Sequence, residues 1–147
     1  MTKKSVTPDD ARRVNVGLFI VHPTLDPREI SAELGLEPAF SHRVGEERLV
    51  PSGRPYSHTY RDTRWKHYSR HLLTDQWFCD QISGYVRPLN AHKSFFDELI
   101  RSGGSASIIV QFLGDGYHGD RLSLETMVMM VDLGLSLEIE VFDVPQR

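Results

Sequence analysis

Hydrophobic and polar positions recur with two different periods along the chain, and these periods predict where strands and helices lie. Residues 14–22 are apolar or β-branched on both faces and end at Pro23, which is typical of a strand inside a sheet. Residues 106–113 predict a second strand. The clearest strand pattern is at the C-terminal end, where four apolar residues alternate with Ser136, Glu138 and Glu140: Leu135, Leu137, Ile139 and Val141. This alternation predicts a strand with one dry face and one wet face.

Helix start and stop signals lie between these strands. Asp26 can cap a helix that begins at Pro27, and Gly35 can end it in the left-handed conformation. Ser123 can cap a helix that Gly134 ends. Apolar residues recur in this second helix at i, i+3, i+4 and i+7, the spacing of one helix face: Leu124, Met127, Val128 and Val131.

Two more helical segments are predicted in the middle of the chain, separated by Pro88, which breaks or kinks the pair. Residues 75–86 place Phe78, Ile82, Tyr85 and Val86 on one face, and the segment after Pro88 does the same with Phe95, Phe96, Leu99 and Ile100. Between residues 42 and 71 a turn-rich stretch and an apolar run around Trp65 to Tyr68 predict a long hairpin. We expect Trp65 to lie in the core.

The order of these elements predicts an α+β fold. Two strand-helix-strand halves would form a largely antiparallel sheet with helices packed on one face, a sandwich related to the ferredoxin-like fold. With 147 residues the chain has the size of one domain. We therefore predict a flexible N-terminal lead-in over residues 1–13 and a single α+β domain over residues 14–147.

Composition narrows the class of protein. The chain is 39% hydrophobic and 25% charged, as in ordinary globular proteins. No apolar run approaches the roughly 20 residues of a membrane helix, and residues 1–13 lack the apolar core of a signal peptide. Cys79 is the only cysteine, so neither an intrachain disulfide nor a multi-cysteine zinc site can form. We expect a cytoplasmic protein.

The charge distribution is more informative than the net charge of −3. Residues 42–71, called the basic belt below, hold seven Lys and Arg, four His and only three carboxylates. The belt is therefore net +4, and the rest of the chain is net −7. Candidate partner-binding residues come from this belt and combine cations with aromatic rings: Arg43, Arg48, Arg54, Arg61, Arg64, Lys66, Tyr56 and Tyr60.

Three interpretations of the basic belt remain open. Its arginines can bind carboxylates of a partner protein in a bidentate manner. They can also neutralise phosphates while tyrosines stack on the bases of single-stranded nucleic acid. In the third interpretation the belt is a solvated hairpin that pairs with the chain's own acidic remainder, within one copy or across a homodimer.

The order of landmarks along residues 14–144 resembles a bacterial family of unknown function, DUF4279. The landmarks are Leu25-Asp26-Pro27, Leu34-Gly35-Leu36-Glu37-Pro38, Val44-Gly45-Glu46, Trp65 and Phe142-Asp143-Val144. The resemblance implies an α+β fold without agreed catalytic residues, and some members resemble immunity proteins that neutralise a toxin. The stretch between Gly45 and Trp65 is longer here than in the family's usual pattern.

Signals for catalysis, metals and cofactors are weak. Cys79 lies beside Asp80, which disfavours a reactive thiolate. Nucleophile-elbow and phosphate-loop motifs are absent. His67 and His71, four residues apart, lack an acidic third ligand, and the loop from Asp115 to Asp120 has the composition of a turn.

We therefore predict no catalytic residues, no cofactor and no metal. The leading hypothesis is a non-enzymatic protein-binding or regulatory domain, with an immunity-type role as one form of it. The alternatives are a nucleic-acid-binding accessory protein and a small metal-dependent hydrolase that uses the loop at residues 115–120.

Overall fold

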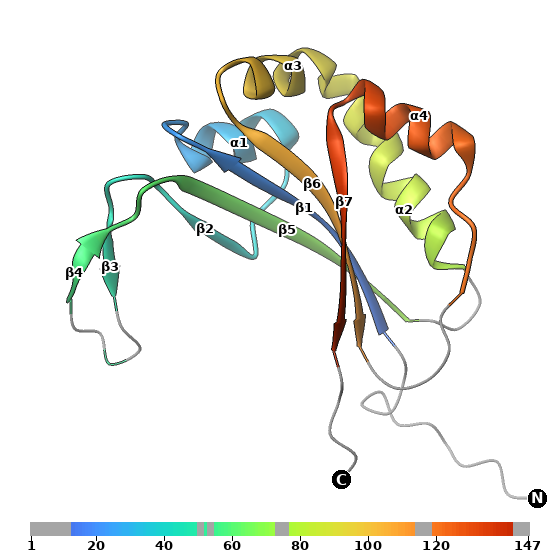
Figure 1. Ribbon diagram of the computed structural model, residues 1–147, viewed down its shortest axis with the longest axis horizontal. Coiled ribbons are helices and arrows are strands. Elements are labelled where there is room, and N and C mark those ends of the chain that lie inside the picture. The colour runs from blue at the N-terminus through green and yellow to red at the C-terminus, as the bar shows by residue number, and fades with distance from the viewer. Residues whose placement is uncertain (1–12, 50–51, 53–54, 73–76, 114–118, 143–147) are drawn as a thin grey trace, which may run out of the picture.

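The computed structural model describes residues 13–49, 52, 55–72, 77–113 and 119–142 (Figure 1). The predicted lead-in therefore lies almost entirely outside the described residues. The strands are β1 (Arg13–His22), β2 (Phe40–His42), β3 (Glu47–Leu49), β4 (Pro55–Thr59), β5 (Thr63–Leu72), β6 (Ser105–Leu113) and β7 (Leu135–Phe142). The helices are α1 (Pro27–Leu34), α2 (Phe78–Val86), the 3-10 helix η1 (Arg87–His92), α3 (Lys93–Arg101) and α4 (Leu124–Asp132).

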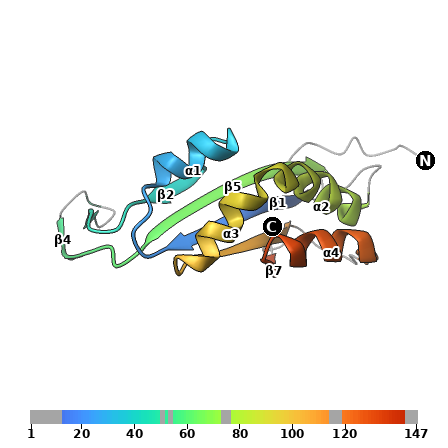
Figure 2. The ribbon, with the colours of Figure 1, turned by 90° about the horizontal axis from the view of Figure 1, so that it is seen from above.

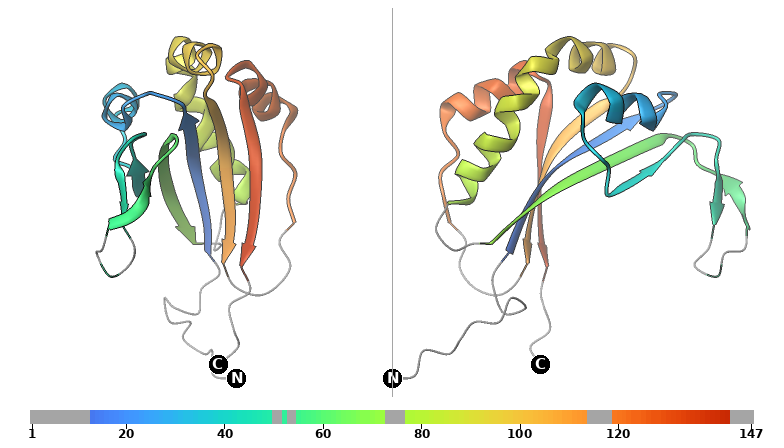
Figure 3. Two further views of the ribbon diagram at one scale, coloured as in Figure 1. Left: turned by 60° about the vertical axis from the view of Figure 1, so that its left-hand side comes forward. Right: turned by 180° about the vertical axis from the view of Figure 1, so that it is seen from behind.

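The predicted α+β fold is confirmed. Five strands form one sheet in the order β2-β5-β1-β6-β7, and β3 pairs with β4 in a separate two-stranded ribbon. Neighbouring strands of the sheet are antiparallel except β6 and β7, which are parallel. The helices gather on one face of the sheet, and the other face carries no described helix (Figures 2 and 3).

The two predicted strand-helix-strand units are present in different forms. In the second unit, β6 and β7 are adjacent and parallel, and α4 makes the crossover between them. In the first unit, β5 is inserted between β1 and β2 and runs antiparallel to both. Because two reversals restore the direction, β1 and β2 are parallel to each other.

Strand β1 lies at the centre of the sheet, as predicted from its apolar residues on both faces. Val14, Val16, Leu18 and Ile20 point toward the helices and are fully buried. Trp65 on β5 is also fully buried, which confirms its predicted place in the core, and its indole N–H donates to Ser31 Oγ of α1 at 2.9 Å. This bond joins α1 to the sheet beside β2.

The predicted helix caps are confirmed. The Asp26 carboxylate accepts from the Arg28 backbone N–H at 2.9 Å, and Gly35 ends α1 with a φ of 65°. The Ser123 hydroxyl accepts from the Thr126 N–H at 3.1 Å at the start of α4. The prediction that Pro88 breaks or kinks the helical pair is confirmed. Helix α2 ends at Val86, Pro88 lies in the first turn of the 3-10 helix η1, where its missing N–H is tolerated, and α3 begins only at Lys93.

The apolar spacing in α4 is a misleading signal for burial. Leu124, Val128 and Val131 are 77%, 66% and 79% exposed, and Met127 is 40% exposed. The buried positions of α4 lie on its opposite face and include Thr126, whose hydroxyl is within 2.6 Å of Ser83 Oγ and 2.8 Å of Ser123 Oγ. Since these hydroxyls satisfy one another, a polar residue can occupy the inner face of the helix.

The prediction of a dry face on β7 is correct only at its first residue. Leu135 is buried, but Leu137, Ile139 and Val141 are 41%, 63% and 69% exposed. Strand β7 is at the edge of the sheet. The described helices therefore leave most of its apolar side uncovered.

Candidate partner-binding groove

A groove of about 760 Å³ lies where β2 and the start of β5 meet the β3–β4 ribbon. Strand pairing brings its walls together, since Phe40 faces Lys66 and His42 faces Arg64 in the β2–β5 register. The ribbon is attached to this corner by two backbone hydrogen bonds, from Gly45 N–H to the Tyr60 carbonyl and from Tyr60 N–H to the Glu46 carbonyl. The groove is lined by Phe40, His42, Arg48, His58, Thr59, Tyr60, Arg61, Asp62, Arg64 and Lys66.

The lining is strongly cationic. Four of its side chains are Arg or Lys and only Asp62 is a carboxylate, so the lining is net +3 with neutral histidines. Arg64 Nε donates to Asp62 Oδ1 at 3.1 Å, and this bond lowers the pKa of the Asp62 carboxyl. Arg61 is exposed and makes no ion pair within the described residues. The groove is therefore suited to an anion.

Aromatic rings support these cations. Tyr60 stacks on His42 with ring centroids 3.6 Å apart and planes 9° apart, and the Arg48 guanidinium lies over the Tyr60 ring at 5.6 Å. On the adjoining sheet face, Lys66 Nζ lies 4.5 Å from the centroid of the Phe19 ring. These cation–π contacts limit the positions that long side chains can adopt.

His42 is the least exposed of the polar residues that line the groove. Its side chain is 9% exposed, and its Nε2 lies 3.6 Å from Asp62 Oδ1, beyond hydrogen-bond distance. Neither ring nitrogen has a hydrogen-bond partner among the described residues. His42 therefore acts mainly as a flat surface beneath Tyr60.

Five of the predicted site residues meet in the groove: Arg48, Tyr60, Arg61, Arg64 and Lys66. Arg43 does not line it, because its guanidinium binds Asp26 at 3.3 Å at the cap of α1. Arg54 lies outside the described residues, and Tyr56 is in β4 but its side chain is not described. The sequence interpretation omitted Phe40, although alternation with His42 on a short strand could have indicated it.

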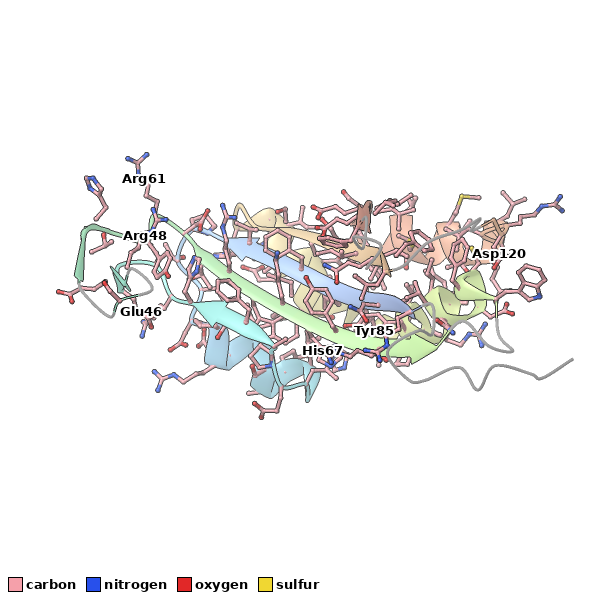
Figure 4. All side chains as sticks on the ribbon, turned by 90° about the horizontal axis from the view of Figure 1, so that it is seen from below. Glu46, Arg48, Arg61, His67, Tyr85 and Asp120 are labelled. Atoms are coloured by element: carbon pink, nitrogen blue, oxygen red, sulfur yellow. The ribbon has the colours of Figure 1, made fainter. Side chains whose placement is uncertain are left out.

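The other predicted chemical groups lie elsewhere and have structural partners. Figure 4 shows Arg48 and Arg61 at one end of the molecule, His67 and Tyr85 near its middle and Asp120 at the far end. His67 Nδ1 is 2.7 Å from the Tyr85 hydroxyl, and burial lowers the pKa of this histidine. Asp120 Oδ2 accepts from the Cys79 backbone N–H at 2.9 Å. Residues 115–118 of the predicted metal loop are outside the described residues.

The Cys79 thiol is held in its protonated form. It is buried on α2, and burial together with the nearby Asp120 raises its pKa to about 12. A thiol of this kind is a poor nucleophile at neutral pH. Within the described part of the chain, no three His, Cys, Asp or Glu side chains are grouped to hold a metal ion, and no helix is long and apolar enough to cross a membrane.

A family model described as "Domain of unknown function (DUF4279)" matches residues 12–143. The chain belongs to the DUF4279 family. This confirms the resemblance drawn from the landmark residues, and the match spans every described strand and helix, from β1 to β7. No curated protein and no solved structure matches the chain significantly. In this DUF4279 member, the cationic groove lies where β2, β5 and the β3–β4 ribbon meet.

Proposed function

We propose that this DUF4279 domain is a non-enzymatic protein-binding domain whose groove receives an acidic segment of a partner protein. The observation that carries the proposal is the charge of the lining, which has four cations and one carboxylate in a volume of about 760 Å³. Guanidinium groups bind carboxylates in a bidentate manner, and the groove presents three of them. The acidic remainder of the chain would orient the approaching partner by repelling its negative charge from other surfaces.

The contacts that the aromatic rings already make favour a protein partner over a nucleic-acid partner. Single-stranded nucleic acid is usually held by bases that stack on free ring faces. Here His42 stacks on Tyr60 and Arg48 lies over the Tyr60 ring, while Lys66 lies over Phe19. These rings already have partners that a base would have to displace, whereas an acidic peptide needs only the cations.

An immunity-type role, in which the acidic partner is a toxin that the domain neutralises, is one form of this proposal. Regulation of an acidic cytoplasmic protein is another. Both forms require a protein partner that binds in a fixed stoichiometry and whose binding depends on the groove residues.

Fluorescence anisotropy with two labelled probes tests the proposal. The probes are a peptide with six glutamates and a 12-nucleotide oligothymidylate. We expect the peptide to bind, with affinity that falls on raising the salt concentration. Charge reversal of two exposed groove residues, Arg48→Glu with Arg61→Glu, should weaken this binding roughly tenfold or more, since two favourable contacts become repulsive.

The matched control is Arg87→Glu with Arg121→Glu, which makes the same change in net charge at exposed positions outside the groove. This control should change peptide affinity less than about twofold. Equal losses in both variants, or no peptide binding by the wild-type protein, would overturn the proposal. Tighter binding of the oligothymidylate than of the peptide would replace it with the nucleic-acid interpretation.

Affinity capture from a lysate, with and without nuclease, then identifies the partner. A single protein that survives nuclease, is lost with the groove variant and is kept with the control variant is the expected result.

A further inference from the structure

The outer face of α4 is apolar although it faces solvent. Leu124, Met127, Val128 and Val131 form one stripe along the helix, and three of them are more than 60% exposed. The inner face is also largely apolar, with Met130 buried beside Thr126. A helix that is hydrophobic on opposite faces is normally covered on both. The outer stripe of α4 therefore lacks a covering element among the described residues.

Strand β7 lacks one as well. Leu137, Ile139 and Val141 lie on its helix side and become more exposed along the strand, from 41% to 69%. The sheet ends at β7, which pairs only with β6 among the described strands. An apolar side of a sheet is normally covered by a helix. In the described part of the chain, the α4 stripe is an apolar helix face without a cover, and the helix side of β7 is an apolar strand face without a helix. The two surfaces are therefore complementary.

The charges on β7 distinguish between two ways in which a second copy could bind. Antiparallel pairing of β7 with β7 of a second copy across a two-fold axis keeps residues of the same face opposite each other. Every such register near the middle of the strand places Glu138 or Glu140 opposite a glutamate of the other copy, which is destabilising. A helix that packs on the apolar side avoids this repulsion, because both glutamates point to the opposite face of the sheet.

We propose that two copies of this chain form a two-fold dimer in which α4 of each copy covers the apolar stripe of β7 of the other. The contact is self-complementary, as an isologous interface requires. The stripes also match in length. From Leu124 to Val131 the helix rises about 10 Å, and from Leu137 to Val141 the strand extends about 13 Å.

The exposed apolar area is sufficient for such a contact. Seven partly or largely exposed aliphatic side chains leave on the order of 500 Å² of apolar surface in water, as large as the biggest patch on a typical monomer. Two patches of this size, with their polar rims, approach the roughly 1,200 Å² at the lower end of stable interfaces. Helix α4 lies on the side of the molecule away from the β3–β4 ribbon (Figure 1), and β7 is at the edge of the sheet opposite β2, the strand that lines the groove. Dimerisation therefore leaves the groove of each copy open.

The mass of the full chain in solution, measured by sedimentation or light scattering up to about 200 µM, tests the dimer. The wild-type protein should have twice the chain mass of 16.8 kDa. An α4 variant, Val128→Glu with Val131→Glu, and a β7 variant, Ile139→Lys with Val141→Lys, should each be monomeric. Because all four positions are more than 60% exposed, the fold should be retained, which circular dichroism checks. Trp77→Glu, which removes a 66% exposed apolar side chain outside the patch, should remain dimeric.

Mixing the two monomeric variants tests the arrangement itself. In the mixed dimer, one contact joins the unchanged α4 to the unchanged β7, and the other joins glutamates on α4 to lysines on β7. Recovery of a dimer in the mixture, but in neither variant alone, is the expected result. Monomeric wild-type protein, a dimer that survives either double substitution, or a mixture that stays monomeric would overturn the proposal.

Discussion

The ring of Tyr68 lies across Gly17 on the face of the sheet that carries no described helix. A Cβ atom placed on Gly17 would lie 2.6 Å from Tyr68 Cδ1 and closer still to the backbone carbonyl of His67. The His67 carbonyl belongs to the backbone of β5, so it cannot move without disturbing the pairing of β5 with the central strand β1, and the Tyr68 ring would also have to turn away. Gly17 therefore has a packing role, and its backbone needs no unusual φ.

Alanine substitutions at Gly17 and Gly84 should have opposite effects. Gly17→Ala should lower the free energy of unfolding by roughly 2 kcal/mol or more, since overpacking of a tight site forces backbone shifts. Gly84 lies in α2 and is exposed, and a Cβ atom placed on it would meet nothing within 4 Å. Gly84→Ala should raise stability by about 0.5–1 kcal/mol through helix propensity. Urea unfolding followed by circular dichroism measures both, and equal signs would contradict the packing argument.

Stability should fall as the pH drops below 7, in part through His22. This buried side chain accepts two backbone hydrogen bonds at Nδ1, from Thr24 and Leu25 at 3.0 and 2.9 Å. Ser102 Oγ lies 2.7 Å from the Glu98 carbonyl and donates to it, so it accepts from His22 Nε2–H at 2.8 Å. The folded protein therefore holds a neutral imidazole, and burial lowers its pKa.

Proton linkage gives the direction in which the free energy of unfolding changes with pH. The unfolded chain binds a proton near pH 6.5 and the folded chain does so only at lower pH, so the stabilisation is complete above pH 6.5 and is lost on acidification. His22→Asn retains an acceptor but does not titrate. The loss of stability between about pH 7 and pH 5 should be smaller in this variant, by at most about 1.4 kcal/mol per pH unit for one proton. Identical pH dependence in the two proteins would show that His22 does not contribute.

Cys79 should be nearly inert toward alkylation in the folded protein. With a pKa of about 12, its thiolate fraction at pH 8 is roughly a thousandfold lower than that of an ordinary cysteine, and burial adds a steric barrier. The rate of reaction with iodoacetamide at pH 8, in buffer and in concentrated urea, measures the difference. Rates within tenfold of each other would contradict the buried, protonated thiol.

Removal of the groove's carboxylate should strengthen anion binding. Asp62→Asn leaves Arg64 without its charged partner and raises the net charge of the lining by one. We expect the affinity for the six-glutamate peptide to rise about two- to fivefold, with a larger gain at low salt. The control is Asp97→Asn on α3, which removes a carboxylate paired with Lys93 and does not line the groove. Unchanged affinity of the Asp62 variant would mean that the peptide binds elsewhere.

Local chemistry in the sequence was sufficient to predict most of the fold. The caps at Asp26 and Ser123 depend on neighbouring residues only, and the doubly apolar pattern of β1 reports a central strand directly. For α4, the apolar spacing indicates the wrong face as the one packed against the sheet. The cause is physical: spacing identifies an apolar stripe, but it does not identify which surface, if any, covers that stripe. Thr126 could be buried only because hydroxyls from Ser83 and Ser123 reach it, and Ser83 is distant in sequence.

The composition of residues 42–71 is enough to identify the basic belt. It does not show which belt arginines line the groove and which bind the cap of α1. Arg43 and Arg48 are five residues apart, yet the first binds Asp26 and the second lies over Tyr60. That separation arises from the turn at Gly45, which has a φ of 85°. Sequence alone identifies the cations, and the three-dimensional pairing of β2 with β5 determines which of them converge.

The way in which the β3–β4 ribbon is attached has a consequence for how this fold could diversify. The chain leaves the sheet after His42 and returns at Thr63, two positions that the pairing of β2 with β5 holds close together. None of the described residues between them belongs to the hydrophobic core. Because the entropy of closing such an excursion grows slowly with its length, insertions, deletions and exchanges there would leave folding almost unaffected. The scaffold could thus acquire new binding specificities by replacing one surface segment, while the sheet and helices remain unchanged.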